Sequence, residues 1–312
     1  MSAAKKKILV TGGAGLVGSA IKLVEKQYPQ YDFVFTTRQE HDLTKEADVA
    51  SLFETTKPDY VIHTAARVGG IGRNLNSPAQ QFYNNILMNT YVIHYAHLHS
   101  VNKLIAFSSV CAFPAAASIF KEDILQDGPP YPAHGAYAYA KRMVDIQVEA
   151  YNKQYGVKYC SVIPANIFGE NDNFNLEDGH VVPSLIHKCY MAKENGVPFE
   201  VWGDGKPMRE FLYSADVARV CVDLLSEEEL PQRLIVSGEH ELEIKQLVEK
   251  ICNIFNYRNV SWLTDKPNGQ MRRPSDKTIF NSTFDKFEFT DIDKALERTI
   301  GWFQEHYPRI RK

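Results

Sequence analysis

The first half of the chain alternates short apolar runs with longer segments in which apolar residues return every three or four positions. The runs are typical of buried strands, and the longer segments are typical of helices with one apolar face. Such alternation predicts a doubly wound α/β fold, in which helices cover both faces of a parallel sheet. The predicted strands are Lys7–Thr11, Asp32–Thr37, Asp59–Thr64, Lys103–Ser108 and Lys158–Pro164, and the predicted helices are Ser19–Lys26, Ala47–Thr56, Pro78–His99 and Tyr137–Tyr155.

The pattern changes after Asn166. Residues 169–179 are polar and rich in Asn and Asp, which predicts a loop. We expect two domains: residues 1–168 with about 213–238 around the main sheet, and about 169–212 with 239–312 as a smaller α/β domain on the substrate side. In this second half we predict a helix at Val181–Glu194, a strand at Phe199–Trp202, a return to the main sheet at Ala215–Leu225 and Arg233–Ser237, and helices at Glu241–Phe255 and Ile292–Tyr307.

A glycine loop follows the first predicted strand and leads into a helix. Its glycines are Gly12, Gly15 and Gly18, which is the spacing of the dinucleotide-binding fingerprint of Rossmann sheets. We expect Gly12 to permit a tight turn, Gly15 to let the backbone approach a pyrophosphate, and Gly18 to allow close packing of helix and strand. A P-loop is excluded, because Ser19 and Ala20 stand where that motif requires Lys and Ser or Thr.

The charged residue after the second strand selects the cofactor. Arg38 lies about 20 residues beyond Gly18, where an arginine suits the 2′-phosphate of NADP and a carboxylate suits the ribose of NAD. A guanidinium binds phosphate with two parallel hydrogen bonds. Glu40 and Asp42 lie just beyond and count against this choice, but Arg38 favours NADP(H).

Composition narrows the class of protein. The net charge of −3 gives no broad basic surface for a nucleic acid. No apolar run approaches the ~20 residues that span a bilayer, and the first residues do not resemble a signal peptide. The five cysteines are scattered, which favours a reducing compartment, and we expect the cytoplasm. No CxxC or HExxH pattern predicts a metal site.

Tyr137 and Lys141 stand four residues apart, so they share one face of the predicted helix. A nearby ammonium favours the phenolate, and we therefore expect Lys141 to lower the pKa of Tyr137 from its usual value of about 10. A phenol tuned in this way can give a proton to a ketone oxygen. Ser109, at the end of the fourth strand, can reach the same oxygen.

Glycine loop, strand-end serine and Tyr-x-x-x-Lys together resemble the extended short-chain dehydrogenase/reductases. Further motifs resemble one branch of them, the GDP-L-fucose synthases, from about Lys6 to the C-terminal helix. That resemblance implies conversion of GDP-4-keto-6-deoxy-D-mannose to GDP-L-fucose, by epimerisation at C3 and C5 and then NADPH-dependent reduction at C4. The motifs are His63-Thr-Ala-Ala-Arg-Val-Gly-Gly-Ile71, Ser109-Val-Cys-Ala-Phe-Pro114, Tyr137-Ala-Tyr-Ala-Lys-Arg-Met143, Asp172-Asn-Phe-Asn-Leu-Glu-Asp-Gly-His180 and Trp202-Gly-Asp-Gly-Lys-Pro-Met-Arg209.

The same resemblance assigns site residues. It implies that Cys111 and His180 exchange the protons at C3 and C5, that Ser109 binds the developing oxyanion, and that the partner is a small nucleotide sugar. It also implies a homodimer formed by the helices at Pro78–His99 and Tyr137–Tyr155. The implied substrate contacts are Lys188, Trp202, Arg209 and Asn268, and the implied cofactor contacts are Gly12, Gly13, Ala14, Gly15, Leu16, Val17, Gly18, Arg38, Asp42, Leu43, Lys141, Pro164, Ala165, Asn166, Ile167 and His180.

One position departs from the branch. Asn268 stands where the branch has an aspartate that can accept two hydrogen bonds from guanine, and an amide accepts without charge assistance. A 4-epimerase or reductase acting on a UDP- or dTDP-sugar is therefore the alternative. A 4,6-dehydratase is disfavoured, because Val110 and Cys111 replace the acidic pair of those enzymes. A cofactor-binding redox sensor is disfavoured because Tyr137 and Lys141 are both present.

Overall fold

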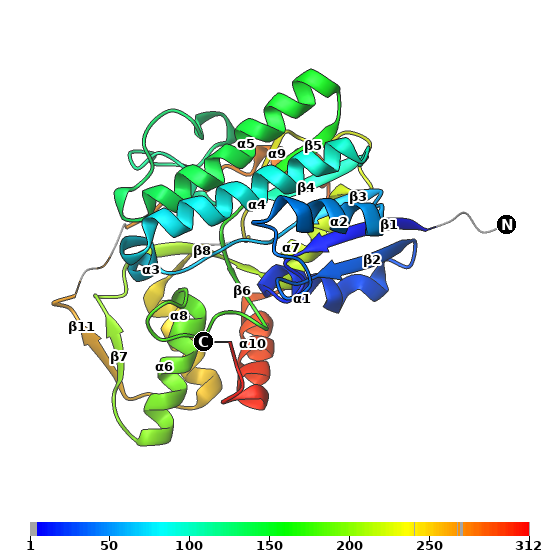
Figure 1. Cartoon of the computed structure of the whole chain (residues 1–312). Helices are drawn as coiled ribbons and strands as arrows, with labels where there is room; N and C mark the ends of the chain where they lie inside the picture. The colour runs from blue at the N-terminus through cyan, green and yellow to red at the C-terminus, as the bar shows by residue number, and fades with distance from the viewer. Residues whose placement is uncertain (1–4, 240, 267, 269–270, 312) are drawn as a thin grey trace.

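Six parallel strands form the central sheet of the computed structural model, which describes residues 5–239, 241–266, 268 and 271–311 (Figure 1). The strand order is β2-β1-β3-β4-β5-β9, and every neighbouring pair is parallel. The order reverses between β1 and β3, the switch point beyond which doubly wound sheets bind ligands. The predicted fold class is confirmed. The strands are β1 (Lys6–Thr11), β2 (Tyr31–Thr36), β3 (Tyr60–His63), β4 (Lys103–Phe107), β5 (Lys158–Pro164) and β9 (Arg233–Val236).

Helices cover both faces of this sheet, because successive residues of a strand point to opposite sides. On β1, Ile8 and Val10 pack with α1 and α7, whereas Leu9 packs with α2, α4 and α5. In Figure 1, α4 and α5 lie side by side along one face. The helices are α1 (Leu16–Val24), α2 (Glu46–Thr56), α4 (Pro78–Leu98), α5 (Gly135–Tyr155) and α7 (Ser214–Leu224).

A second hydrophobic core lies at the carboxyl-end side of the sheet. Helices α6 (Val181–Asn195), α8 (Ile244–Phe255) and α10 (Ile292–His306) enclose it, and aromatic side chains such as Phe174 and Phe303 fill it. Two small sheets, β10-β8-β6 and β11-β7, complete this part of the molecule. The remaining elements are β6 (Asn166–Phe168), β7 (Phe199–Trp202), β8 (Met208–Tyr213), β10 (Glu241–Glu243), β11 (Val260–Leu263), α3 (Ile71–Asn76), α9 (Thr278–Thr283) and the short 3₁₀ helices η1 (Glu25–Gln27), η2 (Val110–Ala112), η3 (Glu122–Ile124) and η4 (Pro132–His134).

The predicted elements of the main sheet are present, and their ends differ from the predicted bounds by no more than three residues. The predicted return to the sheet is confirmed, because β9 pairs with β5 and α7 packs against α1. One prediction was wrong: residues 241–243 form strand β10 rather than the start of a helix, because their backbone pairs with β8. Within the described residues, no helix has the length and apolar character to cross a membrane.

Candidate active site

The glycine loop folds tightly at the carboxyl end of β1. Gly12 has a φ of +71°, and a Cβ there would lie 2.8 Å from the amide nitrogen of Ala65. A Cβ on Gly18 would lie 2.3 Å from the carbonyl oxygen of Gly12. Gly12 therefore permits the turn, as predicted, and Gly18 lets α1 pack onto the backbone of the loop itself.

The start of α1 is built to receive an anion. A Cβ on Gly15 would meet only the carbonyl oxygen of Gly12, at 3.2 Å, so the outer face of this residue is bare backbone. Gly15 is also the N-cap of α1, and no side chain caps the helix. The first amides of the helix thus face outward at its positive end, an arrangement that suits a pyrophosphate. The loop therefore fits a dinucleotide.

Beyond β2, local hydrogen bonds hold the two carboxylates whose negative charge could repel the 2′-phosphate of NADP. The carboxylate of Glu40 accepts from the amide (2.7 Å) and hydroxyl (2.9 Å) of Thr37, and that of Asp42 accepts from the hydroxyl of Thr44 (2.8 Å). These bonds lower the pKa of both carboxyl groups. Arg38 is exposed in the same turn. This arrangement favours a phosphate rather than a bare ribose next to Arg38.

The other predicted cofactor positions include two buried apolar side chains and the segment that leaves β5. Leu43 and Val17 are buried in the core on opposite faces of the sheet. Residues 164–167 run from the end of β5 into β6, and the side-chain amide of Asn166 donates to the carbonyl of Glu210 (2.9 Å).

Three predicted catalytic residues meet at the end of β4. Ser109 caps η2, and its hydroxyl oxygen accepts from the amide of Cys111 (3.2 Å). Hydrogen bonding with Ser109 also lowers the pKa of both the Tyr137 phenol and the Cys111 thiol, against the larger effect of burial. The turn that carries Ser109 and Cys111 packs against α5, the helix that carries Tyr137.

The predicted lowering of the Tyr137 pKa was wrong. Tyr137 and Lys141 lie in the first two turns of α5 and are both buried. Burial raises the pKa of Tyr137, and it lowers the pKa of Lys141 to about 7. The ammonium group of Lys141 donates to the carbonyl of Phe107 (2.7 Å). Desolvation disfavours the charged form of both groups and outweighs their spacing on the helix.

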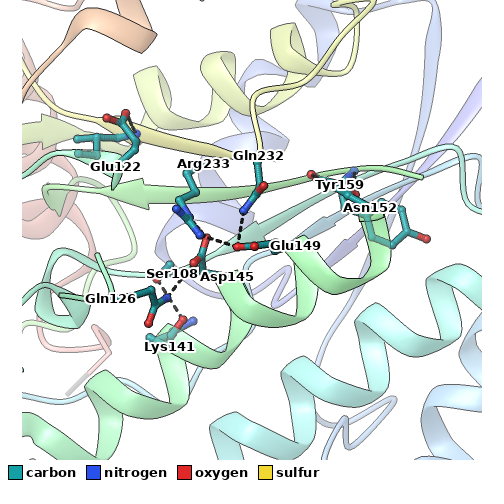
Figure 2. Close-up of polar contacts among 11 residues, drawn as sticks. Ser108, Glu122, Gln126, Lys141, Asp145, Glu149, Asn152, Tyr159, Gln232 and Arg233 are labelled. Atoms are coloured by element: carbon teal, nitrogen blue, oxygen red, sulfur yellow. Dashed lines mark hydrogen bonds and ion pairs between the residues drawn. The ribbon is translucent and has the colours of Figure 1, made fainter. Parts of the chain in front are cut away.

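A buried polar network fixes α5 against the sheet (Figure 2). The carboxylate of Asp145 is fully buried and accepts from Arg233 of β9 (2.6 Å) and from Gln126 (2.9 Å). Arg233 also contacts Glu149 one turn further along α5 (2.7 Å). The hydroxyl of Ser108 donates to the carbonyl of Lys141 (3.1 Å). The helix that carries Tyr137 and Lys141 is thereby held in one position.

His180 occupies the N-cap of α6, at the end of the loop 169–179. The residue is exposed, yet the surrounding protein still lowers the pKa of its imidazole by desolvation, and the charge of Arg311 adds to this effect. Burial raises the pKa of the half-buried Cys111. Near neutral pH the two groups therefore rest as an uncharged imidazole and a protonated thiol, that is, as one proton acceptor and one proton donor.

The predicted substrate residues gather around α6, β7 and β8. The ammonium of Lys188 lies over the ring of Trp202, 5.4 Å from its centroid, and Trp202 is 60% exposed. The side-chain oxygen of Asn268 accepts from the amide of Asp204 (2.8 Å), in the turn just after Trp202. Arg209 lies on β8, and its guanidinium donates to the carbonyl of Met208 (2.7 Å). The structure thus brings Asn268 close to the Lys188–Trp202 pair.

Comparisons with known proteins agree on the relationship. The model of the NAD dependent epimerase/dehydratase family matches residues 8–237. The chain is 38% identical to the GDP-L-fucose synthase of Dictyostelium discoideum over 99% of this chain and 98% of that protein, and 32% identical to that of Escherichia coli K12 over 98% and 99%. A GDP-L-fucose synthetase from Naegleria fowleri bound to NADP superimposes with a TM-score of 0.92 at 38% identity, covering 98% and 95% of the two chains.

The chain belongs to the GDP-L-fucose synthase family. The resemblance recognised in its motifs is thereby confirmed.

The structure also places a charged side chain at the site that local sequence patterns do not reveal, that of Arg273. The guanidinium of Arg273 donates to the carbonyl of Ala115 and lies over the ring of Phe120, 5.7 Å from its centroid. Its charge lowers the pKa of Cys111, against the larger effect of burial. Arg273 lies more than 150 residues after Cys111, so only the tertiary fold places it there.

A second unpredicted contact joins two family motifs. Arg73, just after the Val-Gly-Gly-Ile segment, forms an ion pair with Asp178 (2.7 Å), and the amide of Gly70 donates to the carbonyl of Asp178 (3.0 Å). The loop that ends at His180 is therefore tied to the start of α3. Within the described residues, no cluster of three or more His, Cys, Asp or Glu side chains could hold a metal ion.

Proposed function

We propose that this protein converts GDP-4-keto-6-deoxy-D-mannose to GDP-L-fucose by 3,5-epimerisation followed by reduction of the C4 ketone. The observation that carries the proposal is geometric: Ser109 and Cys111 share the turn at the end of β4, and this turn packs against α5, whose first turn carries the buried Tyr137. A dehydrogenase needs the phenol beside the cofactor, whereas a thiol in the same site adds a group that can exchange protons at carbon. The GDP-L-fucose synthases named above support the same reaction.

The cofactor is NADP(H), which supplies the hydride for C4. The bare backbone at Gly15 and the uncapped start of α1 support a pyrophosphate site, and Arg38 supports the 2′-phosphate. Lys141 would bind the nicotinamide ribose. Residues around the main sheet would hold this cofactor, and the second core would hold the nucleotide sugar. The related Naegleria structure is bound to NADP.

Epimerisation comes first because the C4 ketone is what makes its neighbouring protons acidic. Loss of a proton from C3 or C5 gives an enolate, and return of a proton from the opposite face inverts the centre. We assign this exchange to Cys111 and His180, whose pKa values are shifted in opposite directions. Ser109 would donate a hydrogen bond to the enolate oxygen at C4.

Reduction follows and consumes the ketone. Tyr137 would protonate the C4 oxygen as the hydride arrives at carbon. Its raised pKa keeps the phenol protonated before the reaction, and this is the form that a proton donor needs.

The nucleotide base is the least constrained part of the substrate. Lys188 and Arg209 supply cations suited to the diphosphate, and Trp202 supplies an exposed ring. Asn268 already uses its side-chain oxygen in the turn at Asp204. Recognition of guanine would therefore depend on the hydrogen bonds that this amide can still form. A UDP- or dTDP-sugar remains the alternative substrate. We expect titrations to rank GDP above UDP and dTDP, and the reverse order would favour the alternative.

Two substitutions test the assignment by separating the two chemistries. In the Cys111→Ser variant, solvent deuterium should enter C3 and C5 about 100-fold more slowly, because a serine hydroxyl is a much weaker acid than a thiol and exchanges its proton with carbon poorly. In the Tyr137→Phe variant, NADPH oxidation should fall by a similar factor while deuterium exchange continues. Mass spectrometry and absorbance at 340 nm measure the two steps. Deuterium exchange at the wild-type rate in Cys111→Ser would sink the epimerase assignment.

We also propose a homodimer that works in the cytoplasm. Large apolar side chains are exposed on the paired helices α4 and α5, among them Tyr83 and Ile146, and a second copy of the chain would cover them. All five cysteines are free thiols, which suits a reducing compartment.

A further inference from the structure

Two adjacent side chains of α5 hold the turn of residues 109–111 at both of its ends. The ammonium group of Lys141 donates to the carbonyl of Phe107 (2.7 Å), just before this turn. The guanidinium of Arg142 donates to the carbonyl of Ala112, just after it, through Nε (3.0 Å) and through Nη2. The backbone that carries the site hydroxyl and thiol therefore runs between two carbonyls that are bonded to one helix.

A third hydrogen bond extends the contact of Arg142 to a later part of the chain. Its Nη1 donates to the carbonyl of Gly128 (2.8 Å). Pro114 and Pro130 pair here as an antiparallel bridge, and a Cβ on Gly128 would lie 3.5 Å from the Cβ of Pro114. Arg142 thus joins both ends of the loop of residues 112–128 to α5.

The guanidinium of Arg142 is buried and is compensated by backbone oxygens. Arg142 is 5% exposed, and its three hydrogen bonds within the described residues all end on these two carbonyls. It also lies over the ring of Tyr139, 5.5 Å from the centroid. The first carboxylate after it on α5, Asp145, accepts from Arg233 and Gln126 (Figure 2). A buried charge is costly unless hydrogen bonds compensate it, so the burial of Arg142 depends on the position of the two carbonyls.

We propose that Arg142 is a positioning residue that fixes Cys111, through the backbone of Ala112, relative to Tyr137 on the same helix. A planar guanidinium presents its donors in a fixed fork, so the two carbonyls bound to it keep a set separation. Tyr137 lies five residues before Arg142 on α5, and one rigid helix therefore places both the phenol and the turn. The inference rests on the proposed role of Cys111 in proton exchange, and it gives Arg142 no contact with substrate.

The reactivity of the Cys111 thiol in the ligand-free, full-length protein tests this positioning. Cys111 is half-buried and the other four cysteines are buried, so labelling with iodoacetamide, read at each cysteine by mass spectrometry, contains its own comparison. In Arg142→Met, Cys111 should be alkylated about fivefold to tenfold faster, because a turn released from α5 exposes the thiol. The buried cysteines should keep their wild-type rates. Arg142→Lys keeps the charge and one donor group, and should show a smaller acceleration at Cys111.

Arg219→Met is the matched control for the loss of an arginine that binds backbone. The guanidinium of Arg219, on α7, donates to Asp216 (2.7 Å) and to the carbonyl of Glu288 (2.6 Å). Helix α7 packs on the face of the sheet opposite α5, so Cys111 should react at the wild-type rate in this variant. The proposal is wrong if Cys111 also reacts at the wild-type rate in Arg142→Met, or if all five cysteines accelerate together. If Arg142→Met does not fold, the same comparison in Arg142→Lys decides.

A second readout connects the position of the turn to the chemistry. In Arg142→Met, solvent deuterium should enter C3 and C5 at least about tenfold more slowly, because proton exchange at carbon depends on the placement of the thiol. The Kd for NADPH should change less than about threefold, because the glycine loop and Arg38 follow β1 and β2. A loss of NADPH affinity as large as the loss of exchange would contradict the proposal, since Arg142 would then hold α5 rather than the turn. A wild-type protein that exchanges no deuterium would count against the proposed function alone, because the labelling of Cys111 needs no substrate.

Discussion

Lys141 is an ionisable side chain that the fold buries almost completely. It is 2% exposed, and burial lowers its pKa to about 7 from about 10.5 in an unfolded chain. The unfolded state therefore binds more protons than the folded state between these values, and stability rises with pH across this window. Below pH 7 the cost of the buried charge is fully present. Above about pH 10.5 it is absent.

Lys141→Met should remove this cost together with the activity. We expect the variant to gain about 1–2 kcal/mol of stability relative to wild type at pH 6.5, and we expect the difference to shrink as pH approaches 10. Urea unfolding at both pH values measures it, with exposed Lys153→Met on the same helix as control. An advantage that stays constant or grows with pH would contradict the argument. NADPH oxidation should fall at least about 100-fold.

At this scale, the sequence identifies residues whose role depends on neighbours along the chain. The glycine loop and the Tyr137–Lys141 spacing are local patterns. The structure places the loop between β1 and α1 and both residues on α5, as the patterns predict. The charge state of these groups is different, because desolvation depends on segments that are distant in sequence. For this reason the predicted effect of Lys141 on Tyr137 was wrong, and Arg273 and Arg311 were not foreseen.

At the scale of elements, α5 is the part of the site whose position is most strongly determined. Asp145 lies fully buried between Arg233 and Gln126, whereas Glu149 meets the same arginine at the surface, with its side chain 48% exposed. If the buried carboxylate of Asp145 is removed, the charged guanidinium of Arg233 remains without that partner. The surface pair is exposed to water and salt, which weaken it.

Removing Asp145 should therefore cost much more than removing Glu149. We expect Asp145→Ala to lower the free energy of unfolding by about 2–4 kcal/mol, and Glu149→Ala to lower it by about 0–1 kcal/mol. Chemical denaturation at neutral pH compares the two variants on one helix and against one arginine. Equal losses would mean that burial of Asp145 makes its contact with Arg233 no more important than the exposed contact of Glu149, which would contradict the argument.

Three of the strands that sequence reasoning missed share a physical feature. β6, β10 and β11 contain three or four residues each, and their partners come from distant parts of the chain. Strands this short carry no period that distinguishes them from loops. Glu241–Glu243 carries two carboxylates and reads as the start of a helix, yet pairing with β8 decides its conformation. The long strands of the main sheet are recognisable because both of their faces are buried.

For the whole molecule, the proposed homodimer would form through the outer face of α4 and α5. Tyr83 on α4 is 61% exposed and Ile146 on α5 is 42% exposed, although side chains of this size usually find a partner surface. The two helices lie side by side, so a twofold axis would pair them with their copies in a four-helix interface (Figure 1).

We expect the wild-type protein to sediment as a dimer at micromolar concentration. Tyr83→Glu and Ile146→Glu should each weaken the dimer at least about tenfold, because each places a charge in an apolar interface. Leu23→Glu on α1, where the leucine is 56% exposed, is the matched control and should leave the dimer intact. Sedimentation velocity across a concentration series distinguishes these results, and a wild-type monomer at every concentration would refute this assembly.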